Sequence, residues 1–118
     1  PGLYADCLAE MDQLAAAYDD AFQHCDALLL PTSPTLPSPI PQDPEAIDPQ
    51  TLDAVFGDTR NTAPFNLTGH PAVSVPADRP DTMPVGVQLV GRPEAEALLL
   101  ALAAEVERTH TQPWKATP

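Results

Sequence analysis

The 118-residue sequence is poor in lysine, cysteine and glycine, and each shortage argues against a kind of partner or site. It has 5 basic residues against 17 acidic ones, a net charge of −12, and its only lysine is Lys115. Because phosphate backbones are bound by clusters of lysine and arginine, we expect no direct nucleic-acid partner. The acid excess is typical of a solvated, repulsive surface, and adaptation to high salt is an equally open interpretation.

Long apolar runs are also missing. A membrane-spanning helix needs about 20 consecutive apolar residues, and no window of this sequence approaches that length. Residues 1–6 are neither basic nor followed by an apolar stretch, so they do not match a secretory signal. We therefore expect a soluble, cytoplasmic protein with no membrane partner.

Only two cysteines occur, Cys7 and Cys25, and both fall in one expected helix. At ~1.5 Å per residue they would lie ~27 Å apart, whereas a disulfide needs a Cα spacing of ~4.4–6.8 Å. We predict two free thiols that serve as small core residues, as suits a reducing compartment.

Groups for common catalytic chemistry are scarce. The three histidines lack metal-ligand spacing and the five glycines do not cluster, so we expect no metal and no cofactor. Ser74 and His70 lie four residues apart on an extended segment, about 13 Å, which is too far for a nucleophile and its base.

Helical periodicity and end signals predict four helices. The first covers residues 3–25, a short one residues 48–57, the third residues 59–67, and the last residues 94–110. Gly69 is expected to end the third, which must carry Pro64 in its first turn. The first helix is expected to bury Tyr4, Cys7, Leu8, Met11, Leu14, Tyr18, Phe22 and Cys25. The last is expected to bury Leu98, Leu99, Leu100, Leu102, Ala103 and Val106.

Three apolar runs predict strands. Residues 26–30 form a continuous run, which is typical of a strand buried on both faces. Residues 72–76 and 83–91 alternate and should pair like a hairpin. Val73, Val75, Val85, Val87 and Leu89 then share one side. The other side carries Ala72, Ser74, Gly86 and Gln88, small or polar residues that predict close packing of another element.

Seven prolines between residues 31 and 49 exclude both helix and sheet there. We predict an extended strap over residues 31–49 that lies on the protein surface. Recruitment of a partner domain with an aromatic groove is the alternative.

Four blocks together resemble the C-terminal part of amidase-signature enzymes: residues 26–32, 62–76, 83–93 and 96–105. The two middle blocks, TAPFNLTGHPAVSVP and MPVGVQLVGRP, carry most of the specificity. The resemblance implies an α/β fold with a mixed β-sheet and flanking helices, of which residues 1–118 form a C-terminal segment of one domain. It also implies hydrolysis of a small-molecule amide by a serine, a second serine joined by a cis peptide, and a lysine base.

The catalytic residues of that family have no match in this sequence. It has no adjacent serines and no Gly-Gly-Ser run, and no lysine precedes Lys115. No catalytic residue is carried over, so we expect a fragment of a larger enzyme that is inactive alone. The resemblance implies substrate-binding candidates in two loops, although each is also an ordinary cap or turn residue. These candidates are Asp58, Thr59, Thr62, Thr32 and Ser33.

Two alternatives remain open from the sequence. One is a segment of the A subunit of a tRNA-dependent amidotransferase, which would need a partner protein. The other is a non-catalytic scaffold or interaction domain whose exposed sheet edges are covered by self-association.

Overall fold

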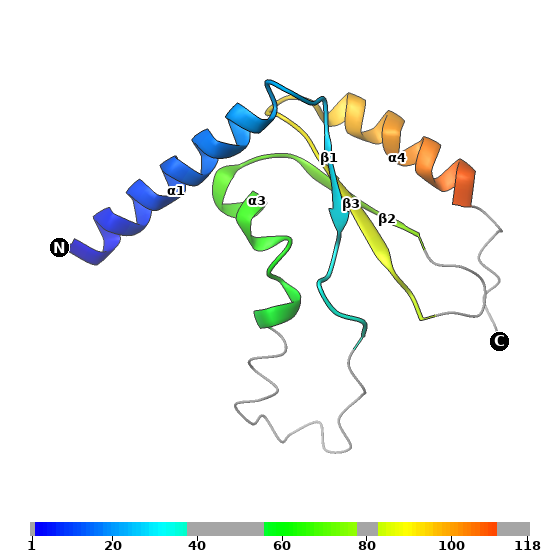
Figure 1. The fold of residues 1–118 in the computed structure, drawn as a ribbon, viewed down its shortest axis with the longest axis horizontal. Helices are drawn as coiled ribbons and strands as arrows, with labels where there is room; N and C mark the ends of the chain where they lie inside the picture. The colour runs from blue at the N-terminus through cyan, green and yellow to red at the C-terminus, as the bar shows by residue number, and fades with distance from the viewer. Residues whose placement is uncertain (1, 38–55, 78–82, 111–118) are drawn as a thin grey trace, which may run out of the picture.

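A computed structural model describes residues 2–37, 56–77 and 83–110. Along the chain the elements are α1 (Gly2–Ala21), β1 (Leu28–Pro31), α3 (Ala63–Thr68), β2 (Ala72–Pro76), β3 (Gly86–Val90) and α4 (Glu96–His110). Figure 1 shows the three strands between α4 on one side and α1 and α3 on the other. Most of the short helix expected at 48–57, and the strap beyond residue 37, lie outside the described residues.

The strands form an antiparallel sheet with β3 in the centre, in the order β1-β3-β2. Gln88 of β3 lies opposite Leu30 of β1 and Ser74 of β2, and the other positions follow in register. The expected pairing of β2 with β3 is confirmed, and so is the α/β class. Both outer strands are edges of the described sheet.

Helix α4 covers one face of this sheet. Val75 and Leu89 pack there with Leu99 and Ala103 of α4, and all four are buried. Val73 and Val87 pack against the same cluster. The strand alternation therefore predicted this face correctly.

The opposite face is covered by the end of α1 and by α3. Phe22, Phe65 and Val90 form a buried cluster, with Tyr18 beside it. Val90 has no exposed surface at all. These contacts cover the Val90 end of this face, while packing of another element against Ala72, Ser74 and Gly86 stays a prediction.

Gly69 ends α3 as predicted. Its φ is +73°, in the left-handed region that favours glycine, and its N–H donates to Phe65 O. Pro64 lies in the first turn of α3, where the missing N–H costs nothing. The helix begins at Ala63, because the residues from 59 to 62 form turns instead.

The expected burial of α1 is wrong for its first half. The helix ends at Ala21, and none of its residues is buried. Leu3 and Tyr4 are 81% and 75% exposed, and Cys7 is also exposed. Figure 1 shows why: this half projects away from the sheet, and no described element covers it. Both cysteines are free, as predicted, but Cys7 is not a core residue.

Two other expectations about burial are also wrong. Strand β1 is not buried on both faces, because Leu29 at the sheet edge is 63% exposed. On α4, Leu98 and Leu100 face away from the sheet and are exposed. This helix begins at Glu96 instead of Glu94, since Glu94 has a φ of +67° that a helix cannot contain.

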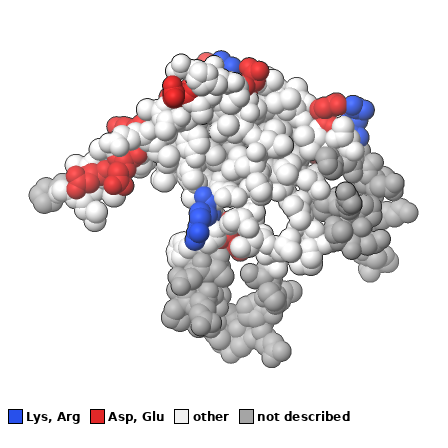
Figure 2. Space-filling view, in the orientation of Figure 1, with Lys and Arg blue, Asp and Glu red and all other residues white. Residues whose placement is uncertain are grey.

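Acidic residues dominate the charged surface of the described ranges, and α1 alone carries five with no basic residue. Figure 2 shows them gathered along that helix. No helix in the described ranges is both long enough and apolar enough to cross a bilayer.

We predict that L99A lowers the free energy of unfolding by about 2–5 kcal/mol, because it leaves a cavity between α4 and the sheet. Its chain neighbour Leu100 is 64% exposed, so L100A should change stability by less than about 0.5 kcal/mol. Urea unfolding of both variants measures the difference. Equal losses would show that α4 does not pack as described.

Candidate functional site

A cleft of about 340 Å³ opens where β1 leaves the sheet and β3 begins. Four separate segments line it: the residues after β1, the segment before α3, the middle of β2, and the start of β3 with the two residues before it. Its lining residues are Thr32, Ser33, Pro34, Thr35, Leu36, Pro37, Asp58, Ser74, Pro84, Val85 and Gly86.

A pair of hydroxyl groups lies on the sheet side of this cleft. Thr32 Oγ1 and Ser74 Oγ are 2.6 Å apart and bridge across the central strand at Gly86. A Cβ on Gly86 would lie 2.9 Å from the Thr32 oxygen and 3.1 Å from the Ser74 oxygen. Glycine is therefore required by this close approach. Because one hydroxyl donates to the other, the second hydrogen remains available to a ligand.

Asp58 supplies the only charge among the described residues that line the cleft. It accepts a hydrogen bond from the Thr35 hydroxyl, and Ser33 Oγ in turn accepts one from the Thr35 backbone N–H. None of the ion pairs between described residues includes Asp58. A half-buried carboxylate with no cationic partner among the described residues favours a ligand that brings a positive charge or hydrogen-bond donors.

The structure brings together three of the five predicted binding residues. Thr32, Ser33 and Asp58 line the cleft. Thr59 and Thr62 do not; their hydroxyls donate to Phe56 O and Thr59 O and close the local turns. A substrate-binding role for each of the five stays a prediction.

Thr35, Ser74 and Gly86 also line the cleft, although no sequence pattern predicted them as binding residues. Thr35 lies within the proline-rich stretch, where a third hydroxyl close to Thr32 and Ser33 was a usable signal. Ser74 and Gly86 were assigned to the small, polar side of their strands, and that side faces the cleft. Their position beside each other depends on the register between β2 and β3, which the sequence alone does not give.

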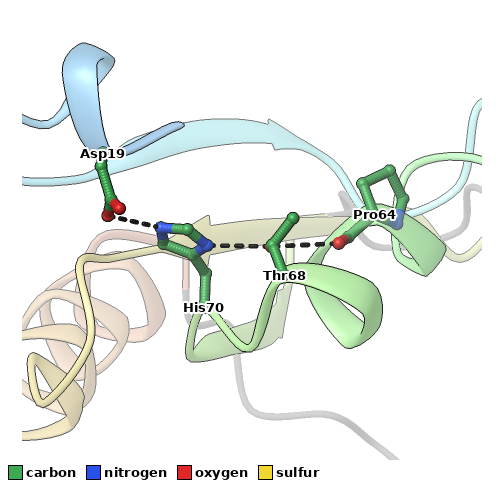
Figure 3. Close-up of polar contacts among 4 residues, drawn as sticks. All are labelled: Asp19, Pro64, Thr68 and His70. Atoms are coloured by element: carbon green, nitrogen blue, oxygen red, sulfur yellow. Dashed lines mark hydrogen bonds and ion pairs between the residues drawn. The ribbon is translucent and has the colours of Figure 1, made fainter. Parts of the chain in front are cut away.

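A second polar cluster surrounds His70, whose side chain is 1% exposed (Figure 3). Nδ1 lies 2.9 Å from Thr68 Oγ1, and Nε2 lies 3.3 Å from Asp19 Oδ1. Thr68 Oγ1 also donates to Pro64 O, so the hydrogen bonds connect the His70 ring to α3.

The His70 ring also stacks on Phe22, and it meets the edge of Tyr18. These contacts join α1 to α3 and leave the ring closed to a ligand. Ser74 bonds Thr32 instead of His70, in agreement with the rejection of a nucleophile–base pair.

A larger hollow of about 780 Å³ lies beside the turn between α1 and β1. Its ion pair joins Arg92 to Asp26 at 3.3 Å, and both side chains are mainly exposed. Such pairs contribute little, and no predicted site residue lies there. The smaller cleft is therefore the better candidate.

The Amidase family model matches residues 3–100 of this chain. The A subunit of glutamyl-tRNA(Gln) amidotransferase from Thermotoga maritima superposes with a TM-score of 0.75 at 31% identity, over 90% of this chain and 22% of that protein. A 6-aminohexanoate cyclic dimer hydrolase superposes with a TM-score of 0.75 at 31% identity, over 94% of this chain and 24% of the enzyme.

A relative in Rhodococcus erythropolis, described as an uncharacterized protein in the nthA 5′ region, is 38% identical over 94 residues. The match covers 79% of this chain and 46% of the relative. The chain thus spans less than half the length of each of these three proteins.

We predict that G86A costs about 1–3 kcal/mol of stability, because the new methyl group displaces the Thr32–Ser74 hydroxyl pair. In a T32A/S74A background both oxygens are gone, and the same change should cost clearly less. Denaturant unfolding of the unaltered chain, G86A, T32A/S74A and the triple variant tests this. G57A is the control, since nothing lies within 4 Å of a Cβ at that position. An equal cost of G86A in both backgrounds would contradict the close approach.

Proposed function

Since this chain belongs to the amidase-signature family, we propose that it supplies scaffold and part of the substrate pocket in an enzyme that hydrolyses carboxylic amides. The observation that carries the proposal is the cleft in which Thr32, Ser74 and Asp58 converge from three segments. Polar groups that converge in a concave site are typical of ligand binding. The similarity to a 6-aminohexanoate cyclic dimer hydrolase supports the same class of reaction.

Amide hydrolysis needs a nucleophile, a base and donors for the oxyanion. This sequence offers no adjacent serine pair and no lysine other than Lys115. In our proposal, the serine nucleophile, the second serine and the lysine base belong to a part of the enzyme outside these 118 residues. The serine oxygen attacks the amide carbon, and its proton passes through the second serine and the lysine to the amide nitrogen, which leaves as the amine. The acyl-enzyme ester that remains is hydrolysed by water, which releases the acid and returns the proton to the serine.

The cleft would hold the substrate while that chemistry proceeds. The Thr32–Ser74 pair can donate one hydrogen bond, and Asp58 can accept hydrogen bonds or face a cation. Leu36 and Val85, which line the same cleft, offer apolar contacts for the carbon part of the substrate. A substrate that combines an amide with a second polar or cationic group fits this arrangement best.

Membership of a tRNA-dependent amidotransferase, as its A subunit, is the second candidate, favoured by the similarity to the Thermotoga maritima protein. That function would transfer the released ammonia and require a partner protein. The net charge of −12 argues against direct tRNA contact by this segment. A non-catalytic scaffold that associates through the open edges of β1 and β2 is the third candidate.

We predict that this chain alone releases no ammonia from amides, whereas the intact protein that carries it does. A panel of aliphatic, aromatic and amine-bearing amides, assayed for ammonia or amine release, tests both parts. Turnover or acyl-enzyme formation by the isolated chain would contradict the proposal. Glutamine hydrolysis that requires a copurifying protein would favour the amidotransferase, and an intact protein without any turnover would favour the scaffold.

In an active intact enzyme, we predict that D58N raises KM for amine-bearing amides about tenfold, because it removes the charge facing the cation. KM for neutral amides of similar size should change less, and kcat should stay nearly constant. D20N is the control, since Asp20 is exposed on α1. An equal change in KM for charged and neutral substrates would exclude this role of Asp58.

A further inference from the structure

We propose that Gln88 and Asn61 are positioning residues that hold the Asp58 wall of the cleft at a fixed distance from the Thr32–Ser74 pair. Neither residue lines the cleft. Each acts through hydrogen bonds that tie the turn before α3 to the sheet. The inference rests on the proposed function, because it assigns these two residues to the same substrate-binding site.

The tie begins inside the sheet. Gln88 lies in the central strand and is 2% exposed, so water does not compete for its amide. Its Nε2 donates to the backbone oxygen of Asn61 at 2.6 Å. A buried amide that loses its partner is costly, so this bond fixes where Asn61 lies.

Asn61 carries the tie onward to β1. Its side-chain Nδ2 donates to Pro31 O at 2.9 Å. The next residue, Thr32, provides one of the two cleft hydroxyls, and its N–H donates to Gly86 O at 2.9 Å. Asn61 thus accepts a hydrogen bond from β3 and donates one to β1, so it connects the segment before α3 to both strands.

The turn transmits this position to Asp58 because it is bonded internally. Arg60 N donates to Gly57 O at 3.2 Å, and Ala63 N donates to Thr59 O at 2.8 Å. Asp58 lies within this bonded segment, three residues before Asn61. Its bond to Thr35 involves a hydroxyl on an exposed residue, where water competes. The bond from the buried Gln88 side chain to Asn61 O therefore contributes most to holding Asp58 in place.

Loss of the tie should affect binding more than chemistry. If the turn shifts, Asp58 and the hydroxyl pair no longer reach one ligand together, and KM rises. A general loss of folded protein would instead lower the apparent kcat and leave KM unchanged. This difference separates a positioning role from a purely structural one.

The test compares N61D with N66D in the intact protein that carries this chain. Both variants make the same chemical change, but Asn66 is exposed on α3, whereas N61D places a carboxylate against Pro31 O. We expect N61D to raise KM about tenfold with kcat within about twofold, and N66D to leave both unchanged. Hydrogen exchange should rise over residues 57–62 in N61D and stay slow in β3.

Q88M, which keeps the shape of the side chain but removes the donor, should reproduce N61D. If Q88M does not fold, the N61D result alone tests the proposal. Asn61 is only half-buried, so its substitution is compatible with folding. An unchanged KM, or exchange in residues 57–62 equal to that of N66D, would overturn the proposal. Failure of the proposed function looks different: the unaltered intact protein would hydrolyse no amide, and exchange alone would then decide whether the tie exists.

Discussion

The hydrogen bonding of β3 on both of its edges is the constraint from which the rest of the described structure follows. With β1 on one side and β2 on the other, the register fixes which side chains share a face. One face then receives Leu99 and Ala103 of α4, and the other receives Phe22 and Phe65. A shift by one residue would exchange these faces and remove both clusters.

The same register separates packing from ligand binding along a single strand. At one end of β3, Val90 is completely buried beneath α1 and α3. At the other end, Gly86 leaves space for two hydroxyl groups and the cleft. Gln88 lies between them, and its amide connects the packed half to the turn that carries Asp58. The site therefore depends on the core through one short stretch of backbone.

Local signals in the sequence predicted local structure well. The alternation of Val73 and Val75 and the glycine at position 69 need only neighbouring residues, and both predictions are confirmed. Burial is a property of the whole fold, so Tyr4 and Leu29 were wrongly expected in the core. Asp58 and Thr32 were named as binding candidates because of the family resemblance. Their approach to Ser74, and the tie through Asn61, depend on contacts across 27 to 42 residues, which no local pattern encodes.

The two thiols lie in different surroundings. Cys7 is exposed on the projecting half of α1, while Cys25 is half-buried and its Sγ donates to Ala21 O at 3.4 Å. Alkylating reagents react with accessible thiolates, so Cys7 offers a natural attachment point for a fluorophore or spin label. A probe there would report directly on whatever covers α1 in a larger assembly, without any change to the cleft or the sheet.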